Sequence, residues 1–269
     1  MRSFSFSLFL PALLLGMVLT SWHCGDKSSQ GSESSSNDST AEEVAGEPLF
    51  FAGWVDTIET PVYISLLQNG TELTGTMTYV KVGKPISVKG KVVDESFELE
   101  ESIDGKTTGL MQFHVAEGAY EGTWKKSASA KESMPLKLHD LPELDLSDAE
   151  MRKTCDGDYG GIETISWPDV NEEGEEIEAE MEGENSFHAK YVGNRHFEFS
   201  MVTTTHHGFG CSADGYMVMV SPTMAMWWGL EGCSVEFEFK DNGVECHQVG
   251  WSPYYCGASG SLDGFMTKH

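Results

Sequence analysis

The stretch that decides the fold is VYISLLQNGTELTGTMTY, residues 62–79. Apolar and polar side chains alternate on both sides of Asn69-Gly70, and this dipeptide is a strong signal for a tight hairpin turn. The apolar set of the two halves would lie on one face: Val62, Ile64, Leu66, Leu73, Gly75, Met77 and Tyr79. The stretch therefore predicts an antiparallel hairpin with one buried face.

Similar alternation continues outward from this hairpin through residues 49–139. Further turn signals separate the runs at a spacing of roughly 11 residues, which is typical of all-β domains. About eight short strands with hairpin-length links predict an antiparallel meander that closes as a barrel or sandwich. Glycines within strands are typical of tight bends at barrel corners, and the candidates here are Gly75, Gly90 and Gly122.

The remaining sequence divides into four parts. We expect a signal peptide over residues 1–23, a disordered tether rich in Ser, Gly and acidic residues over 24–48, and a linker over 140–154. Ser147 could cap a helical turn within that linker. Residues 155–269 alternate again and contain five of the six cysteines, so we predict a second antiparallel β-barrel or sandwich domain stapled by disulfides.

The N-terminus predicts export. Arg2 precedes an apolar run from Phe4 to Leu19, which is short for a membrane span of ~20 residues and suits a signal peptide. Cys24 would then carry a lipid, although Trp22 and His23 stand where small residues are expected before such a cysteine. The alternative is cleavage near Thr20 or Ser21 with an unmodified Cys24, which would make the protein secreted.

Several motifs of the first domain carry a resemblance. They are Gly-Thr-Met-Thr-Tyr, Gly-Lys-Pro-Ile-x-Val-x-Gly, Phe-x-Leu-x-Glu, Gly-Thr-Trp and Pro-Leu-x-Leu, between residues 75 and 138. This series resembles exported bacterial lipoproteins of unknown function that carry small avidin- or lipocalin-like β-domains. The resemblance implies a barrel fold and no particular activity. The lipocalin Gly-x-Trp signature belongs on the first strand, whereas Gly122-Thr123-Trp124 comes near the end of the domain.

The composition limits the partners. The chain has 43 acidic and 17 basic residues and a formal net charge of −26. Such a chain would repel nucleic acid, whose affinity for proteins comes largely from Lys and Arg on phosphates. We therefore expect a protein of the cell envelope, anchored through its N-terminal lipid on the outer membrane or the periplasmic side. Its partner would be an envelope protein or a small ligand.

The second domain offers one disulfide prediction. A two-residue turn at Asn242-Gly243 would pair Cys246 with Phe239 and place Cys233 opposite Ser252. Cys256 then follows the strand end opposite Cys233, which predicts a Cys233–Cys256 disulfide. The partners of the other cysteines stay open.

Candidate functional residues are few. Tyr79 and Trp124 are predicted to contact a ligand in the lumen or mouth of the first barrel, with plain core packing as the alternative. A rival interpretation is a soft-metal site for copper, with ligands Met217, Met219, Met224, Met226 and His206. No spacing selects a catalytic residue and no cofactor is predicted, so a binding protein is favoured over an enzyme, and a purely structural envelope protein is a third possibility.

Overall fold

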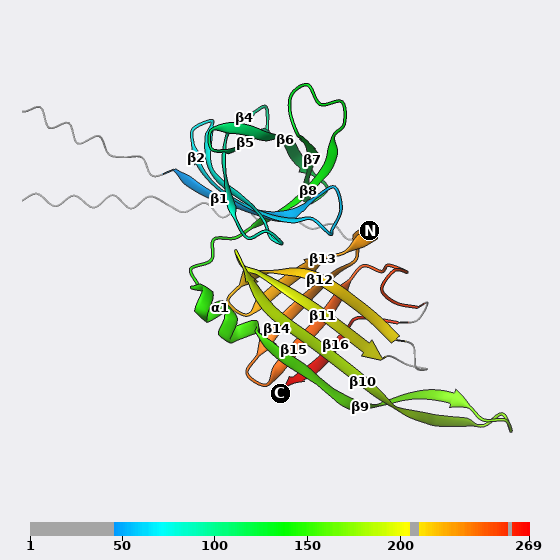
Figure 1. Ribbon diagram of the computed structural model, residues 1–269. Coiled ribbons are helices and arrows are strands. Elements are labelled where there is room, and N and C mark those ends of the chain that lie inside the picture. Colours follow the sequence, from blue (N-terminus) through cyan, green and yellow to red (C-terminus); the bar gives the residue numbers. More distant parts are fainter. Residues whose placement is uncertain (1–45, 205–209, 258–259) are drawn as a thin grey trace, which may run out of the picture. The chain divides into compact units, whose positions relative to one another are not determined.

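The computed structural model describes residues 46–204, 210–257 and 260–269. It confirms the predicted all-β class: two closed antiparallel barrels of eight strands each account for most of the described chain (Figure 1). The N-terminal segment with Cys24, and His206, lie outside the described residues. No helix in the ranges described is long and apolar enough to cross a membrane.

The first barrel is a meander in which each strand pairs with the next and the last strand pairs with the first. Its strands are β1 (Glu47–Val55), β2 (Pro61–Asn69), β3 (Glu72–Tyr79), β4 (Pro85–Val93), β5 (Ser96–Ile103), β6 (Lys106–Ala116), β7 (Ala119–Lys125) and β8 (Met134–Leu141). The predicted hairpin of residues 62–79 forms, with Val62 opposite Tyr79, but its turn lies one residue later than the expected Asn69-Gly70. Its turn is Gly70-Thr71, because Asn69 pairs with Glu72 at the end of the ladder.

The interior of the first barrel is filled with side chains. Four aromatic rings form its centre, with Phe97 stacked on Phe113 at a centroid distance of 4.9 Å and with Phe51 and Tyr120 set edge-on to them. Buried aliphatic side chains surround these rings, including Ile64, Leu73, Met77, Leu136 and Leu138. A filled interior is the arrangement that argues against a large ligand in the lumen.

The glycines within strands stand at close backbone contacts. A Cβ atom on Gly75 would overlap the carbonyl oxygen of Ser65, and one on Gly90 would overlap the carbonyl oxygen of Glu98. Gly122 has the same relation to Gln112, and Gly53 to Lys137. Neighbouring strands therefore approach at these points more closely than any residue with a side chain permits, as expected for sharp bends in a small barrel.

A short helix, α1 (Asp148–Cys155), precedes the second barrel. Ser147 caps it as predicted: the Ser147 hydroxyl accepts from the Glu150 backbone N–H, and the Glu150 carboxylate accepts from the Ser147 backbone N–H at 2.8 Å. Asp148 and Glu150 lie in its first turn and Arg152 and Lys153 in its last. Acidic side chains near the N-terminus and basic side chains near the C-terminus interact favourably with the helix macrodipole and stabilise the helix.

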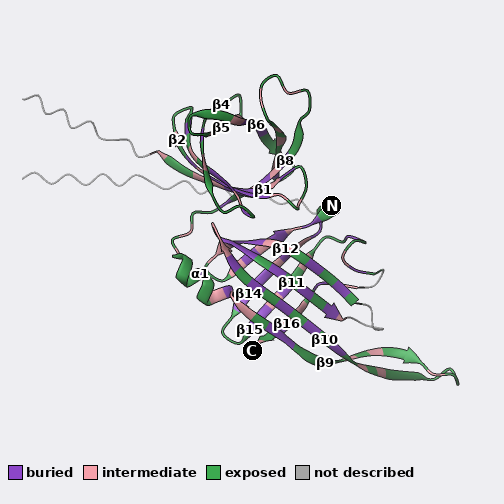
Figure 2. Ribbon diagram, viewed as in Figure 1, coloured by how far each residue is buried: buried purple, intermediate pink, exposed green. Residues whose placement is uncertain are grey.

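In the second barrel, β9 pairs with both β10 and β16 and so closes the sheet. Its elements are β9 (Gly157–Val170), β10 (Glu176–Gly193), β11 (His196–Thr204), β12 (Gly210–Ser221), β13 (Met224–Trp228), the 3-10 turn η2 (Leu230–Gly232), β14 (Ser234–Lys240), β15 (Gly243–Val249) and β16 (Gly264–Lys268). Figure 2 shows buried residues along the strands of the barrel, and mostly exposed residues where β9 and β10 continue beyond it.

The predicted register of the β14–β15 hairpin is wrong by two residues. Lys240 pairs with Gly243, so the turn is Asp241-Asn242 and Cys246 faces Phe237 rather than Phe239. A shift of two residues leaves each side chain on its predicted face. Cys233, Val235, Phe237 and Phe239 are accordingly all buried, as expected.

The predicted Cys233–Cys256 disulfide is also wrong. Cys256 is bonded to Cys211 at the start of β12, where the two residues form an isolated bridge and the Ser212 N–H donates to the Tyr255 carbonyl at 2.9 Å. After β15 the chain thus returns to β12 rather than remaining beside β14. In the described parts of the chain, Cys155, Cys233 and Cys246 are buried and form no disulfide.

Candidate groove and buried carboxylate of the first barrel

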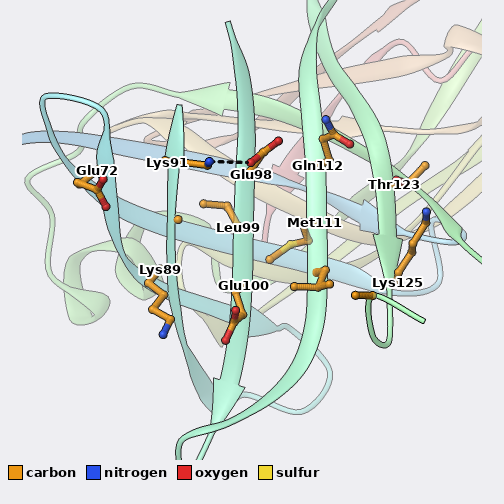
Figure 3. A pocket seen from close by; sticks show the side chains of 13 residues that line it. Glu72, Lys89, Lys91, Glu98, Leu99, Glu100, Met111, Gln112, Thr123 and Lys125 are labelled. Atoms are coloured by element: carbon orange, nitrogen blue, oxygen red, sulfur yellow. Dashed lines mark ion pairs between the residues drawn. The ribbon is translucent and has the colours of Figure 1, made fainter. Parts of the chain in front are cut away.

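A groove of about 560 Å³ lies on the outer face of β3 to β7 (Figure 3). It is lined by side chains that point away from the barrel interior together with the backbone between them. The members are Glu72, Lys89, Gly90, Lys91, Glu98, Leu99, Glu100, Leu110, Met111, Gln112, Thr123, Lys125 and Ala128. Its volume falls within the range of small-molecule and cofactor sites.

Cross-strand pairing aligns the charged side chains of the groove in rows that run across the strands. Lys91 lies opposite Glu98, and their charged groups form an ion pair at 3.5 Å. In the next row Lys89, Glu100, Leu110 and Lys125 are consecutive cross-strand neighbours. Glu100 accepts a hydrogen bond from the Thr107 hydroxyl at 2.8 Å.

Two of these lysines form no ion pair with a described residue. Within the described ranges, neither Lys89 nor Lys125 takes part in an ion pair. Both are exposed. Glu72 and Glu100 line the same groove and form no ion pair in the described ranges either, so the groove presents free groups of both signs.

The structure brings Tyr79 and Trp124 together on the inner side of the same strands. The Tyr79 hydroxyl donates to the Glu101 carboxylate at 3.3 Å, and Glu101 is only 3% exposed. A Cβ atom on Gly109 would overlap both that carboxylate and the Trp124 indole nitrogen, so these groups converge over Gly109. The indole nitrogen of Trp124 is buried and makes no hydrogen bond to any described group.

A β-bulge adjoins this cluster. Glu101 pairs with Gly109 and Ser102 with Thr107, so Thr108 is the extra residue of β6. Bulges often stand where a side chain has to be redirected. Burial, followed by the neighbouring charge of Glu101 and their hydrogen bond, raises the pKa of Tyr79, so the phenol remains a proton donor to the carboxylate.

We expect Tyr79→Phe to lower the free energy of unfolding by about 1–3 kcal/mol, because it removes the hydrogen-bond donor to a buried carboxylate. The matched background is Glu101→Gln, in which the charge is already absent. A double-mutant cycle from urea unfolding should give a coupling of about 1 kcal/mol between the two positions. A coupling within a few tenths of a kcal/mol of zero would show that Tyr79 is only a core residue.

The four methionines of the proposed copper site do not converge. Met217 and Met219 are fully buried in the second barrel and share a face with Ala225, which lies opposite Met219. Met226 lies opposite Val218, on the other face of the sheet, and Met224 shares that face. Since the sulfur atoms are divided between two faces, one metal ion cannot bind all four.

Another possible cation site is already occupied by a lysine. Glu238, Glu245 and His247 bring their ligand atoms within 4.8 Å of one another on the β14–β15 hairpin. The ammonium group of Lys240 forms ion pairs with both carboxylates. This cluster is therefore a surface salt-bridge network.

Burial disfavours ionisation of the three thiols that form no disulfide in the described chain. Burial raises the pKa of Cys246 to about 12, with Asp263 and Glu245 adding to the effect, and burial also raises the pKa values of Cys155 and Cys233. A thiol must ionise to act as a nucleophile or a metal ligand. These three side chains pack in the core of the second barrel.

The sequence analysis identified neither the charged groove nor the buried carboxylate of Glu101. Glu101 could have been found, because it continues the buried phase of Phe97 and Leu99 and is therefore a carboxylate on a core face. The groove residues gave no local signal. Lys89 and Lys125 become neighbours of the same groove only when the register of four strands is known.

The fold and these sites define a class of all-β protein with two eight-stranded barrels, one of which has a charged surface groove. Comparisons with family models, with curated proteins and with solved structures find no match to this chain.

Proposed function

We propose that this chain is an exported, lipid-anchored binding protein of the bacterial cell envelope, without catalytic activity, and that the groove of the first barrel takes an extended ligand with anionic groups. The observation that carries the ligand class is the pair Lys89 and Lys125, which form no ion pair with a carboxylate of the described chain. Export and anchoring are supported by the apolar run that ends shortly before Cys24 and by the Ser-rich sequence after it.

The strand spacing sets the size of this ligand. Lys89 and Lys125 are three strands apart in one cross-strand row, which corresponds to about 14 Å at 4.7–4.9 Å per strand. Leu110 lies between them as an apolar contact, and Gln112 and Thr123 supply polar groups in the adjoining row. An acidic peptide or a short acidic saccharide chain has anionic groups at such a spacing.

The negative charge of the whole chain does not prevent this binding. Charges farther away than the Debye length, about 8 Å at physiological ionic strength, are largely screened at exposed sites. The contribution of Glu98 within the groove is offset by its ion pair with Lys91. Glu72 and Glu100 also line the groove without an ion pair to a described residue, so the attraction for an anionic ligand acts at short range, through direct contact with the Lys89 and Lys125 ammonium groups.

Native mass spectrometry of the protein extracted from its own cells tests this function. We expect a bound ligand on the wild-type protein, and about tenfold lower occupancy in Lys89→Gln/Lys125→Gln, because two charge-assisted hydrogen bonds are lost. Lys84→Gln/Lys106→Gln removes two exposed lysines of the same barrel outside the groove and should retain the ligand. Equal occupancy in both variants, or no ligand on any of them, would reject the groove as the binding site.

The intact mass tests the anchor in the same sample. A chain that begins at Cys24 with added acyl mass is expected. A chain that begins near Thr20 or Ser21 without lipid would instead make this a secreted protein.

A further inference from the structure

The hairpin of β9 and β10 extends beyond the second barrel as a two-stranded arm, residues 161–184 (Figure 1). The barrel neighbours of the two strands end at its base: β16 pairs with β9 at Tyr159 and Gly160, and β11 pairs with β10 from Ser186 onward. Beyond these residues β9 and β10 pair only with each other. Both outer edges of the arm therefore present backbone groups that no other strand of the described chain covers.

Along β10, one face of the arm is a row of carboxylates, and β9 adds the exposed Ile162 and Val170 to the same face. Alternate residues of β10 point to the same face of the ribbon, and those on this face are Glu176, Glu178, Glu180, Glu182 and Glu184. All five are exposed, and none of them forms an ion pair with a described residue. Residues 158–184 contain eleven acidic residues and no Lys or Arg, so nothing within the arm neutralises this row.

The opposite face of the arm is apolar along β10, whereas β9 places Asp169 on that face opposite Ile177. Ile177, Ala179 and Met181 alternate with the glutamates on β10, and Met181 lies opposite Ile165 of β9. None of these four belongs to a hydrophobic core cluster of the described chain, and Ile177 is 43% exposed. Ala179, Met181 and Ile165 are half-buried. A two-stranded ribbon with a partly exposed apolar face is marginally stable by itself, so a partner strand would stabilise it.

We infer that the arm is a docking element for a partner polypeptide with alternating basic and apolar residues, which adds as a third strand along the free edge of β10. In that geometry every second side chain of the partner lies beside the glutamate row, and the side chains between them extend the apolar face. The free edge is the stretch 176–183. At residues 184 and 185, Thr204 already donates hydrogen bonds to the Glu184 carbonyl and the Asn185 side chain.

The charge and spacing of the glutamates favour a basic partner strand over a second copy of this chain or a calcium ion. A second copy of the chain would place like charges side by side along the added strand, which destabilises the pairing. A calcium ion needs six to eight converging oxygen ligands, whereas successive glutamates on one strand face are about 6.7 Å apart along the strand. A row of Lys or Arg residues on a partner strand has the same repeat as the glutamates.

The probe is the peptide acetyl-Lys-Val-Lys-Val-Lys-Val-Lys-Val-amide, titrated into the full chain at physiological ionic strength, with binding followed by isothermal titration calorimetry. Glu178→Gln/Glu180→Gln/Glu182→Gln should raise its Kd about tenfold, as expected for the loss of three exposed ion pairs. The matched control is Glu172→Gln/Glu173→Gln/Glu175→Gln, which removes three charges from the turn of the arm and should change Kd less than about threefold. The arm variants should retain the thermal stability of the wild-type protein because the arm lies outside the barrel cores.

A block peptide with four Lys followed by four Val has the same composition and the wrong pattern, and it should bind about tenfold more weakly. The inference is overturned if the block peptide binds as tightly, if the face and turn variants lose affinity equally, or if the alternating peptide does not bind. Equal loss in the two variants would identify the interaction as unspecific attraction to an acidic surface. Because the arm and the groove share no residue, Lys89→Gln/Lys125→Gln should leave the affinity of this peptide unchanged.

Discussion

Gly90→Ala is expected to lower the free energy of unfolding of the first barrel by about 3 kcal/mol, the upper part of the range for overpacking. A Cβ atom at this position would overlap the Glu98 carbonyl oxygen and also approach the Leu99 Cα atom. Both obstacles are backbone atoms of β5, so no side chain can move aside. The strands would have to separate where Gly90 pairs with Leu99.

The control for this prediction is Gly161→Ala. Gly161 has open space around the position of a Cβ atom and no positive φ angle, so alanine should be neutral or slightly stabilising there. Hydrogen exchange at β4 and β5 would locate the loss of stability in the first barrel, and urea unfolding would give its size. If Gly90→Ala costs less than about 1 kcal/mol, the strands do not approach as closely as described.

The barrel fold was predictable because its signals are local. Alternation with period two and turn residues between the runs define strands, and the glycines at positions 75, 90 and 122 mark the bends that close a small barrel. The prediction of which side chains face the core also tolerates an error in strand register. In the β14–β15 hairpin the turn moved by one residue and the pairing by two, yet the same side chains remained buried.

Long-range partners were less predictable because they depend on register and on irregular segments. The prediction that Cys256 lies beside Cys233 requires the chain after β15 to continue straight along the strand. The residues between Val249 and Cys256 instead turn toward β12, and no alternation in the sequence reports such a turn. The groove could not be predicted for the same reason. Lys89 and Lys125 are 36 positions apart in the sequence and lie in one row only after three strand pairings are fixed.

Reduction of the Cys211–Cys256 disulfide is expected to lower the free energy of unfolding of the second barrel by about 4 kcal/mol. The bond spans 45 residues, and the chain-entropy model gives about this value for a loop of that length. The segment that it holds has little regular secondary structure. Tyr255 also holds this segment: its ring lies edge-on to Trp227 at 4.8 Å, and its hydroxyl accepts from the Leu230 N–H at 2.9 Å.

Cysteine variants test whether the loss of stability on reduction comes from the Cys211–Cys256 pair. Cys211→Ala/Cys256→Ala should already be destabilised by a similar amount, and its unfolding midpoint should not change with reductant. Cys233→Ala leaves a small cavity in the core and costs about 1 kcal/mol, but it should keep the full response to reductant. If Cys233→Ala abolishes that response and Cys211→Ala preserves it, then Cys256 pairs with Cys233. In that case the segment after β15 would remain beside β14 instead of crossing to β12.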